Sequence, residues 1–546
     1  MKKNTFRKGV LLTVTLLSLA SCGGSSGEKK DEQGRDVLRI FMNGGQEYDG
    51  IKKDAVWQEI EEKSGVSLQI EGANHNSDYY SVLNPMINTG DVPDVIFAVP
   101  NAAGNAYNNW VTQDVVWNID ELLAEEPGAY PYLEKILKSD QFKNLTFGDG
   151  AHTLIPYFTS NSGWGIYYRA DWLIATGHVN EDGTAKVPET IEEFQEVLKD
   201  FTEKDPDGNG KNDTFGLSPS NDAFFQNPLY HAFGVKPDYE LLEDGTPTYM
   251  FINPKFKNYL NWMRSMISAG YVDKQFPTNS NYQDRNKFYD GQVGILITNA
   301  EAHVTYIADN LYRANPKAKI VFGKAPIGTK NLGEEGAGGF SDWGGYWGGY
   351  SISKDCAHPE AALRLFNYLY SPEGSKTRCY GLKGTHWDYD SEGNVVPNLD
   401  NRSAEMGDIF NGSKIDGIFQ PTGYYKMGAS FSNDVDWDET STNFQVRIDP
   451  NALDKNYADL IQEALDKNTL CRSNLTNITG FYPSFRSKMK KVEDASEQYA
   501  IQAMVNQGTS VDDYYSQLLE RIEQSTYGWS SIQAMIKEVA AAAGIK

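Results

Sequence analysis

The sequence predicts an α/β protein of two lobes, in which mixed sheets are flanked by helices. The chain has 546 residues, of which 40% are hydrophobic. That is too long for one ordinary core and enough for two. Near the N-terminus, a β-rich run at 37–42 precedes an expected helix over 55–64 and an alternating strand at 66–70. This βαβ pattern implies a parallel, right-handed unit.

Residues 1–21 have the pattern of a secretory signal peptide. Four basic residues precede an apolar run at 10–19, namely Lys2, Lys3, Arg7 and Lys8. The run is well short of the roughly 20 residues that a helix needs to cross a bilayer. No later stretch of the sequence approaches that length. We therefore expect an exported protein without a membrane-spanning helix.

A lipid anchor is predicted at the end of the signal peptide. Residues 19–23 read LASCG, which resembles the bacterial lipobox, where a cysteine directly after the cleavage site receives lipid such as palmitate. Cys22 would be that cysteine. Residues 22–35 then form a Gly/Ser-rich and charged tether. We expect an extracytoplasmic lipoprotein attached to the cell membrane through this anchor alone.

Charge and cysteine content exclude two classes of protein. The formal net charge is -24, and loss of the basic signal peptide makes it more negative still, so nucleic acid is not expected as a ligand. Beyond Cys22, the cysteines Cys356, Cys379 and Cys471 show no metal-ligand spacing. An odd set argues against a disulfide framework. A single disulfide, such as one between Cys356 and Cys379, stays an alternative on the sequence alone.

Helix and strand patterns continue along the chain. Turn residues at 90–94 precede another buried strand, and a strand is expected at 293–297. Thr190 and Glu193 form a predicted capping box that begins a helix reaching about Phe201. Further helices are expected at 254–268, 359–369, 454–466, 488–506 and 511–523. Residues 388–451 form a polar segment rich in turns.

Four ordered segments together resemble a known family. They read GDVPDV at 90–95, YYRADWL at 167–173 with Pro188 and Thr190, KDPDGNGKND at 204–213, and YSISK, HPEAA and YSPEG between 350 and 374. Their order and spacing are similar to the extracellular solute-binding family 1 proteins that serve carbohydrate importers, especially the large lipoproteins of its Gram-positive branch. The resemblance covers nearly all of the mature chain, although residues 388–451 contain no motif of the family.

The resemblance implies a type II periplasmic-binding-protein-like fold. Lobe 1 would contain residues 36–158 and about 350–395, and lobe 2 residues 159–349 and about 396–546. Crossovers are expected near 156–163, 345–351 and 390–400. A monomer would capture a sugar or oligosaccharide by closure of the lobes and deliver it to the transmembrane subunits of an ABC permease.

Other functions stay open on the sequence alone. An oligopeptide or another polar metabolite is the alternative ligand, and a surface polysaccharide-binding adhesin or a glycoside hydrolase is a less favoured reading. The chain has no HExxH, Gly-x-Ser-x-Gly or Walker motif. We therefore predict a binding protein with no catalytic residues.

The acidic loop after the helix that starts at Thr190 has the spacing of an EF-hand. Positions 1, 3, 5, 7 and 9 of such a loop are Asp205, Asp207, Asn209, Lys211 through its carbonyl, and Asp213. Alternate oxygen ligands on a turning backbone suit Ca²⁺, here in a structural role. Position 12, usually a bidentate Glu, is Gly216. The bland alternative is a solvated acidic turn.

Candidate ligand contacts are aromatic and polar residues in loops, because sugars need flat apolar platforms flanked by hydrogen-bonding groups. The candidates are Asn161, Trp164, Tyr167, Asn221, Asp222, Phe224, Phe225, Asn299, His303, Trp343, Tyr346, Trp347, His386 and Trp387. We expect the glycines of residues 339–350 to make that loop both a hinge and a ligand platform. Arg169 and Asp171 are predicted to hold the first crossover, with Trp172 packed against the next helix.

Overall fold

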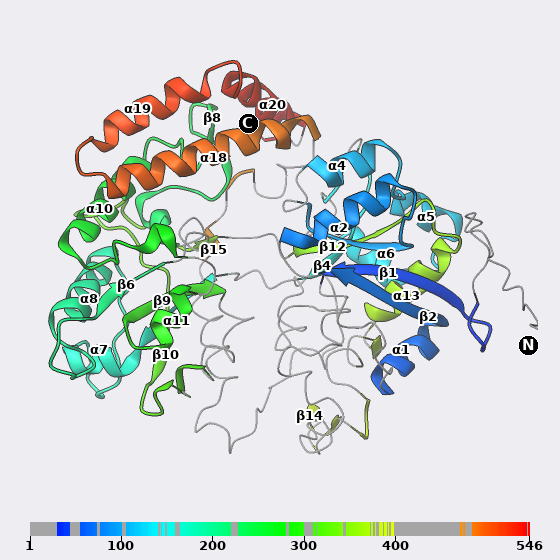
Figure 1. Cartoon of the computed structure of the whole chain (residues 1–546), viewed down its shortest axis with the longest axis horizontal. Coiled ribbons are helices and arrows are strands. Elements are labelled where there is room, and N and C mark those ends of the chain that lie inside the picture. The colour runs from blue at the N-terminus through cyan, green and yellow to red at the C-terminus, as the bar shows by residue number, and fades with distance from the viewer. Residues whose placement is uncertain are drawn as a thin grey trace, which may run out of the picture.

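Two lobes lie side by side in the computed structural model (Figure 1). The structure describes residues 30–43, 55–73, 77–100, 105–139, 142, 145–147, 150–158, 164–219, 228–279, 283–299, 310–312, 314–341, 346–371, 373–374, 377, 382–385, 387–389, 391, 395–397, 470–471, 473–475, 483–542 and 544–545. Buried apolar residues of this part of the chain fall into two separate clusters, one for each lobe.

Lobe 1 is a five-stranded mixed sheet with the order β2-β1-β3-β12-β4. The strands are β1 (Asp36–Asn43), β2 (Val66–Ala73), β3 (Val95–Ala98), β4 (Ile155–Phe158) and β12 (Tyr346–Ile352). Its helices are α1 (Ala55–Ser64), α2 (Ser77–Asn88), α4 (Asn105–Thr112), α5 (Ile119–Glu125), α6 (Pro131–Leu137) and α13 (Pro359–Leu369). β1 runs parallel to β2 and β3, so the predicted βαβ opening is confirmed.

Lobe 2 is built on a four-stranded sheet with the order β10-β5-β9-β6. The strands are β5 (Trp164–Arg169), β6 (Phe215–Leu217), β9 (Val293–Asn299) and β10 (Ile320–Gly323). Helices α7 (Ala170–Thr176), α8 (Ile191–Glu203), α10 (Phe256–Ala269) and α11 (Gln283–Tyr289) accompany it, with 3-10 turns η2 (Pro228–Phe233) and η3 (Phe276–Thr278). The small pairs are β7 (Tyr239–Leu241) with β8 (Pro247–Tyr249) and β11 (Phe340–Ser341) with β15 (Leu470–Cys471). A further pair, β13 (Trp387–Tyr389) with β14 (Val395–Pro397), belongs to lobe 1, where Tyr389 packs against the core.

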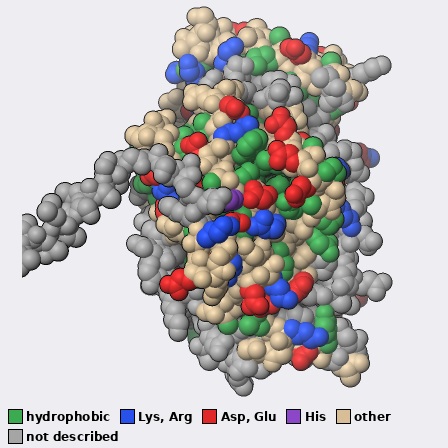
Figure 2. Space-filling view, turned by 90° about the vertical axis from the view of Figure 1, so that its right-hand side faces the viewer, with side chains coloured by type: hydrophobic (Ala, Val, Ile, Leu, Met, Phe, Trp, Pro, Cys, Tyr) green, Lys and Arg blue, Asp and Glu red, His purple; other side chains and the backbone are tan. Residues whose placement is uncertain are grey.

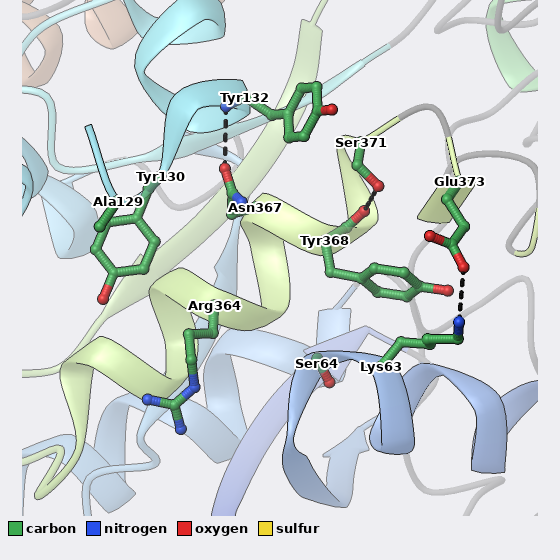
Figure 3. A pocket seen from close by; sticks show the side chains of 10 residues that line it. All are labelled: Lys63, Ser64, Ala129, Tyr130, Tyr132, Arg364, Asn367, Tyr368, Ser371 and Glu373. Atoms are coloured by element: carbon green, nitrogen blue, oxygen red, sulfur yellow. Dashed lines mark hydrogen bonds and ion pairs between the residues drawn. The ribbon is translucent and has the colours of Figure 1, made fainter.

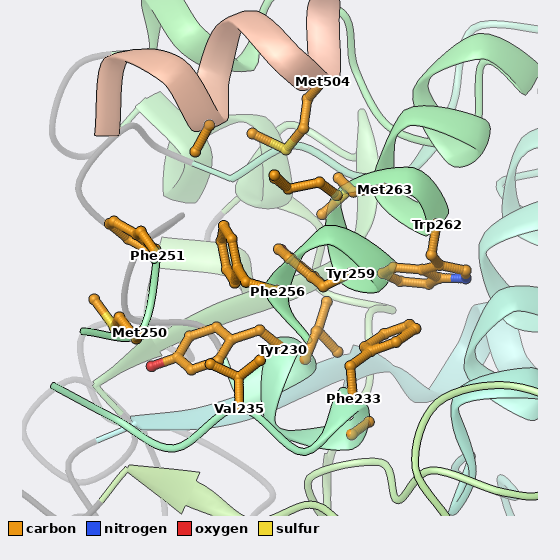
Figure 4. Close-up of a cluster of buried hydrophobic side chains, with 14 of the residues drawn as sticks. Tyr230, Phe233, Val235, Met250, Phe251, Phe256, Tyr259, Trp262, Met263 and Met504 are labelled. Atoms are coloured by element: carbon orange, nitrogen blue, oxygen red, sulfur yellow. The ribbon is translucent and has the colours of Figure 1, made fainter. Parts of the chain in front are cut away.

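Three C-terminal helices return to lobe 2 (Figure 1). They are α18 (Pro483–Val505), α19 (Val511–Ile522) and α20 (Trp529–Ala542). Figure 4 shows Met504 of α18 directed at an aromatic cluster that includes Tyr259 and Phe256 of α10. Both rings and the Met504 side chain are at most 1% exposed. Burial of this apolar surface holds the C-terminal helices on lobe 2, while α18 also contacts α4 of lobe 1.

Local patterns in the sequence predict ten of these elements correctly and miss the others. The ten are β1, β2, β3, β9, α1, α8, α10, α13, α18 and α19. The capping box is present, since the Glu193 N–H donates to Thr190 Oγ1 and the Thr190 N–H donates to Glu193 Oε2. Trp172 is buried and meets the ring of Phe201 in α8 edge-on, as predicted. The helix expected at 454–466 lies outside the described residues. Sequence reasoning missed α20, whose alanine-rich stretch has a weak amphipathic pattern.

Two glycines of the second crossover have a different role from the one predicted. Gly348 and Gly349 lie inside β12, where they pair with β3 and β4 and do not form a turning loop. A Cβ at Gly348 would lie 2.5 Å from the carbonyl oxygen of Ala98, and one at Gly349 would lie 2.3 Å from that of Ile155. The absence of a side chain therefore permits close strand packing here, and backbone rotation at these two positions is not needed.

Cys356 and Cys471 are free thiols, and both are buried. Burial raises the pKa of each thiol above its ordinary value, to about 11 for Cys471. Both thiols are therefore protonated and unreactive at neutral pH. Within the described ranges, no helix is long and apolar enough to span a bilayer.

Gly294 tests the packing of lobe 2. A Cβ at this position in β9 would lie 2.2 Å from a ring carbon of Phe201 and 2.6 Å from one of Trp172. We expect Gly294→Ala to lower the free energy of unfolding by roughly 1–3 kcal/mol, because buried rings cannot move aside without strain. Urea unfolding followed by tryptophan fluorescence measures the loss. The control is Gly508→Ala, whose Cβ would approach only Asn506 Oδ1, at 3.3 Å. Equal unfolding midpoints for the two variants would contradict the prediction.

Candidate functional site

The ends of strands from both sheets face the boundary between the lobes. β4 ends at Phe158 and β5 begins at Trp164, a separation that six residue steps limit to about 20 Å. β3 runs parallel to β4, because both pair antiparallel with β12, so Ala98 lies at the same edge as Phe158. In lobe 2, the antiparallel partner of Trp164 is Asn299, the last residue of β9. Ligands of open α/β sheets bind outside such carboxyl ends.

The predicted ligand contacts fall into three groups. Asn161, Asn221, Asp222, Phe224, Phe225, His303, Trp343 and His386 lie outside the described residues. The backbones of Trp164, Asn299, Tyr346, Trp347 and Trp387 are placed at or near the ends of strands. Trp164 and Asn299 are partners on neighbouring strands, and Tyr346 pairs with Phe158. Ligand contact by all of these residues stays a prediction.

Tyr167 is the one predicted ligand contact whose side chain the structure describes. It is fully buried on β5, and its ring centroid lies 4.2 Å from that of Phe322 in β10. Its neighbours Ile166 and Tyr168 belong to the lobe 2 core, so Tyr167 lies on the opposite face of the sheet. In this conformation the ring supports β10, and contact with a ligand would need it to become accessible.

Arg169 and Asp171 hold the start of α7 where β5 ends, and not the first crossover predicted for them, which lies at the opposite end of β5, before Trp164. Two parallel hydrogen bonds join them, from Nε to Oδ1 at 2.9 Å and from Nη2 to Oδ2 at 2.6 Å. The guanidinium is 2% exposed and also lies over the ring of Trp172, 4.8 Å from its centroid. Bidentate geometry of this kind keeps a planar charge in one orientation. The pair therefore has a structural role.

A buried histidine supports the second crossover from the lobe 2 side. His231 Nδ1 lies 2.6 Å from the carbonyl oxygen of Val235, and Nε2 lies 2.9 Å from Ser341 Oγ. A carbonyl only accepts, so Nδ1 carries the proton and Nε2 accepts from the serine hydroxyl. Burial lowers the pKa of His231 to about 4, so the ring is neutral at physiological pH. Ser341 is the last residue of β11 before the chain crosses to β12.

Four polar side chains form a buried network at the end of β6. Asp273 Oδ2 accepts from Lys287 Nζ at 2.6 Å and from Ser218 Oγ at 2.7 Å. Asn279 Nδ2 donates to Ser218 Oγ and to the Pro219 carbonyl, both at 3.0 Å, while its Oδ1 accepts from Lys287. Ser218 and Asn279 thereby fix the described ends of two segments at the boundary of lobe 2.

The electrostatics of this network favour the charged form of Asp273. Burial acts to raise the pKa of Asp273, but the hydrogen bond from Lys287 outweighs it together with those from the Gln275 N–H and Ser218. The pKa is therefore lower than the ordinary value of 3.8. The sequence contained no sign of this network, because its members are spread over 70 residues and only the fold brings them together.

The predicted calcium loop curls around its own acidic side chains. Asp205 Oδ2 accepts from the Gly210 N–H at 2.9 Å, and Asn209 Nδ2 donates to Asp207 at 2.7 Å and to Asp213 at 3.1 Å. Gly208 and Gly210 have positive φ angles, as does Asp205 at 48°, and these angles turn the backbone. Burial raises the pKa of Asp207, and the nearby charges of Asp205 and Asp213 raise it further.

Position 12 of the loop has no room for the usual glutamate. Gly216 is in β6, and a Cβ there would lie 2.6 Å from Leu198 Cδ2 and 2.7 Å from Leu198 Cα in α8. Close packing of β6 against α8 therefore requires glycine. Any cation in this loop would have to be held by the donors from Asp205 to Asp213, without a bidentate ligand from position 12.

Substitution of Lys287 tests the network at the end of β6. Lys287→Met leaves Asp273 buried without its cation, and we expect a loss of roughly 2–3 kcal/mol at pH 7. That is below the full cost of breaking a buried pair, because Lys287 is 19% exposed. The pKa of Asp273 is lowered in the wild type, so the stabilisation is present at neutral pH and is lost as the pH falls through that pKa. Denaturant unfolding should therefore show a gap between wild type and variant that is smaller well below pH 3.8 than at pH 7.

The matched control is the double variant Asp273→Asn with Lys287→Met. It removes both charges, so no buried carboxylate is left without a partner, and its loss should be smaller than that of Lys287→Met alone. Equal stability of the single variant and the wild type at pH 7 would refute the role assigned to the ion pair.

Comparisons with known proteins agree with this architecture. The polygalacturonan/rhamnogalacturonan-binding protein YtcQ of Bacillus subtilis (strain 168) is 28% identical over 346 residues, which cover 61% of this chain and 64% of that protein. The fructooligosaccharide ABC transporter substrate-binding protein FusA of Streptococcus pneumoniae serotype 4 is 26% identical over 336 residues, covering 56% of this chain and 60% of FusA. The matches thus span about three fifths of each relative.

The fold also matches a solved structure of S. pneumoniae FusA, an EF-hand mutant in complex with fructo-nystose. The TM-score is 0.61 at 18% sequence identity, and the alignment covers 93% of this chain and 99% of that one. This likeness confirms the predicted fold, a two-lobed type II periplasmic-binding-protein-like architecture. Residues 45–376 match the model of the bacterial extracellular solute-binding protein family. The chain belongs to that family.

Proposed function

We propose that the protein captures a sugar or oligosaccharide between its lobes and delivers it to the transmembrane subunits of an ABC importer. The observation that carries the proposal is the convergence of strand ends from both sheets at the crossovers, in a chain of the solute-binding family. Two relatives are named for binding polygalacturonan or rhamnogalacturonan and for transporting fructooligosaccharides, which supports a carbohydrate ligand. The protein acts as a monomer and catalyses no reaction.

Capture works through closure of the lobes. A ligand that contacts strand ends of both lobes gains its full set of contacts only in the closed form, and this difference in affinity shifts the population toward closure. The segments that cross between the lobes are anchored on each side. Tyr346 to Ile352 is paired within the lobe 1 sheet, and Ser341 is bonded to His231 in lobe 2. Closure would therefore move the two lobes as units, each carrying its anchored part of the crossover.

The structural role of the acidic loop is to bind Ca²⁺. The donors fit a hard cation, because three carboxylates and an amide alternate along the loop. Burial, with the charges of Asp205 and Asp213, raises the pKa of Asp207. A divalent cation would replace the Asn209 amide N–H groups as the partner of Asp207 and Asp213. Without a ligand at Gly216, the site would be weak, in the range of about 10⁻⁴–10⁻³ M typical of extracellular modules.

The anchor is Cys22, which would carry lipid after removal of the signal peptide. Lys30 is the first described residue, and its Nζ donates to Asp36 Oδ1 at 2.7 Å. The tether would therefore join lobe 1 at the start of β1, the end of that strand that is directed away from lobe 2 (Figure 1). This one segment would attach the folded part of the protein to the outer surface of the cell membrane.

A ligand screen tests the main proposal. We expect a neutral fructooligosaccharide or an acidic oligogalacturonide to stabilise the protein by about 2.7 kcal/mol at a concentration 100 times its dissociation constant. Thermal unfolding measures the stabilisation, and small-angle scattering should show a smaller radius of gyration with the same ligand. Stabilisation by oligopeptides alone would contradict a carbohydrate ligand, and release of reducing sugar would contradict a binding protein.

Metal removal tests the calcium loop. Addition of Ca²⁺ after EDTA treatment should raise the melting temperature, and Mg²⁺ at the same concentration should raise it less. Asp207→Asn should abolish the response to Ca²⁺. In the metal-free protein the raised pKa of Asp207 means that its charge destabilises the loop as the pH rises, so Asp207→Asn should be at least as stable as wild type at pH 7. An unchanged response to Ca²⁺ in this variant would count against the site.

Metabolic labelling tests the anchor. Wild-type protein should incorporate labelled palmitate and remain with the membrane fraction, whereas Cys22→Ala should incorporate none. Cys356→Ala is the matched control, since that thiol is buried in lobe 1. Labelling of Cys22→Ala at the wild-type level would exclude Cys22 as the lipidated residue.

A further inference from the structure

A pocket lies on the outer face of lobe 1, far from the boundary between the lobes. It has a volume of about 520 Å³ and lies between α1, α6 and α13 (Figure 3). Its lining residues are Lys63, Ser64, Ala129, Tyr130, Tyr132, Arg364, Asn367, Tyr368, Ser371 and Glu373. Arg364 binds Asp36, the first residue of β1, whereas Asn43 at the other end of that strand faces lobe 2. Eight residues of strand separate the two regions by about 23 Å.

Three tyrosine rings surround the pocket. Figure 3 shows Tyr130, Tyr132 and Tyr368 on three sides of Asn367. Tyr132 is 36% exposed, among the most exposed large hydrophobic residues that the structure describes, and its hydroxyl has no partner. An exposed ring fixed on a helix offers a flat apolar face to the C–H surface of a sugar. The pocket volume is within the range of small-molecule sites, about 300–1,000 Å³.

Polar groups in the pocket are held in place and still have donors to spare. Asn367 Oδ1 accepts from the backbone N–H groups of Tyr132 at 3.0 Å and Leu133 at 3.4 Å, which leaves its Nδ2 free to donate. Arg364 Nη2 donates to Asp36 Oδ2 at 2.8 Å, and its Nε and Nη1 have no hydrogen-bond partner among the described residues. Each side chain is thus oriented by one contact and can bind a hydroxyl with another.

The charges around the pocket are balanced. Lys63 pairs with Glu373 at 2.9 Å, and Arg364 pairs with Asp36. Figure 2 looks onto this side of the molecule and shows basic and acidic side chains interspersed, with no large field of one sign. An anionic ligand would gain no net attraction from such paired charges, whereas a neutral ligand with many hydroxyls can use both donors and acceptors.

We propose that this outer pocket is a second carbohydrate-binding site, which takes one or two units of a neutral glycan and acts independently of the site between the lobes. Tyr132 provides the stacking platform, and Asn367 and Arg364 donate to sugar hydroxyls. A long glycan bound at both sites is held at two points, which raises the effective concentration of its free end near the interlobe site.

Affinity electrophoresis of the mature full-length protein tests this site. Native gels contain starch, levan or a mixed-linkage β-glucan as neutral polymers, and polygalacturonate as the anionic one. We expect at least one neutral polymer to retard the wild type, with affinity reduced about tenfold in Tyr132→Ala. Arg364→Lys keeps the ion pair with Asp36 but removes the spare guanidinium donors, so it should also weaken retardation.

The control is Tyr271→Ala, which removes a partly exposed tyrosine of lobe 2 that donates to Glu203. It should migrate like wild type. Small-angle scattering with a short oligosaccharide, measured on the same variants, reports on lobe closure at the interlobe site, and the decrease in radius of gyration should be unchanged in Tyr132→Ala. The proposal is overturned if no neutral polymer retards the wild type, if polygalacturonate alone does so, or if Tyr132→Ala is retarded as strongly as wild type.

Discussion

Insertion of β12 between β3 and β4 is the contact on which the arrangement of the two lobes depends. The strand arrives from lobe 2 and completes the lobe 1 sheet, so one segment belongs to the core of one lobe and the connection to the other. Gly348 and Gly349 make this possible, because the neighbouring carbonyl oxygens would collide with any side chain. Ser351 adds a buried hydroxyl that donates to the Thr153 carbonyl oxygen of the adjoining segment. The lobe 1 end of the crossover is therefore held in the sheet by β12.

Buried polar groups fix the ends of strands in lobe 2. A sheet end that faces another lobe cannot be finished with apolar side chains alone, since backbone groups there lose their partners. The network of Ser218, Asp273, Asn279 and Lys287 satisfies these groups and holds the end of β6. His231, with a neutral ring, accepts from the Ser341 hydroxyl and donates to the Val235 carbonyl oxygen. At the ends of β6 and β11, polar side chains next to the apolar core fix the point at which the chain leaves the core.

Charge is distributed differently in the regions assigned to ligands. The acidic loop brings carboxylates together, and burial with their charges raises the pKa of Asp207, which suits a cation. The outer pocket of lobe 1 pairs its charges and leaves neutral donors exposed beside tyrosine rings, which suits an uncharged sugar. The strand ends between the lobes lie apart from both. Lobe 1 thus has strand ends directed at lobe 2 and the outer pocket on the opposite side. A ligand at one of these surfaces does not contact the other.

The sequence by itself determined the α/β class, the capping box at Thr190 and six of the described helices, because each depends on residues close together in the chain. It also determined the EF-hand-like spacing of the acidic residues from Asp205 to Asp213. Only the tertiary structure decided that Gly216 has no room for a glutamate, that Gly348 and Gly349 are strand-packing residues, and that Lys287 meets Asp273. Those features depend on contacts between segments far apart in the chain, which local periodicity and spacing do not encode.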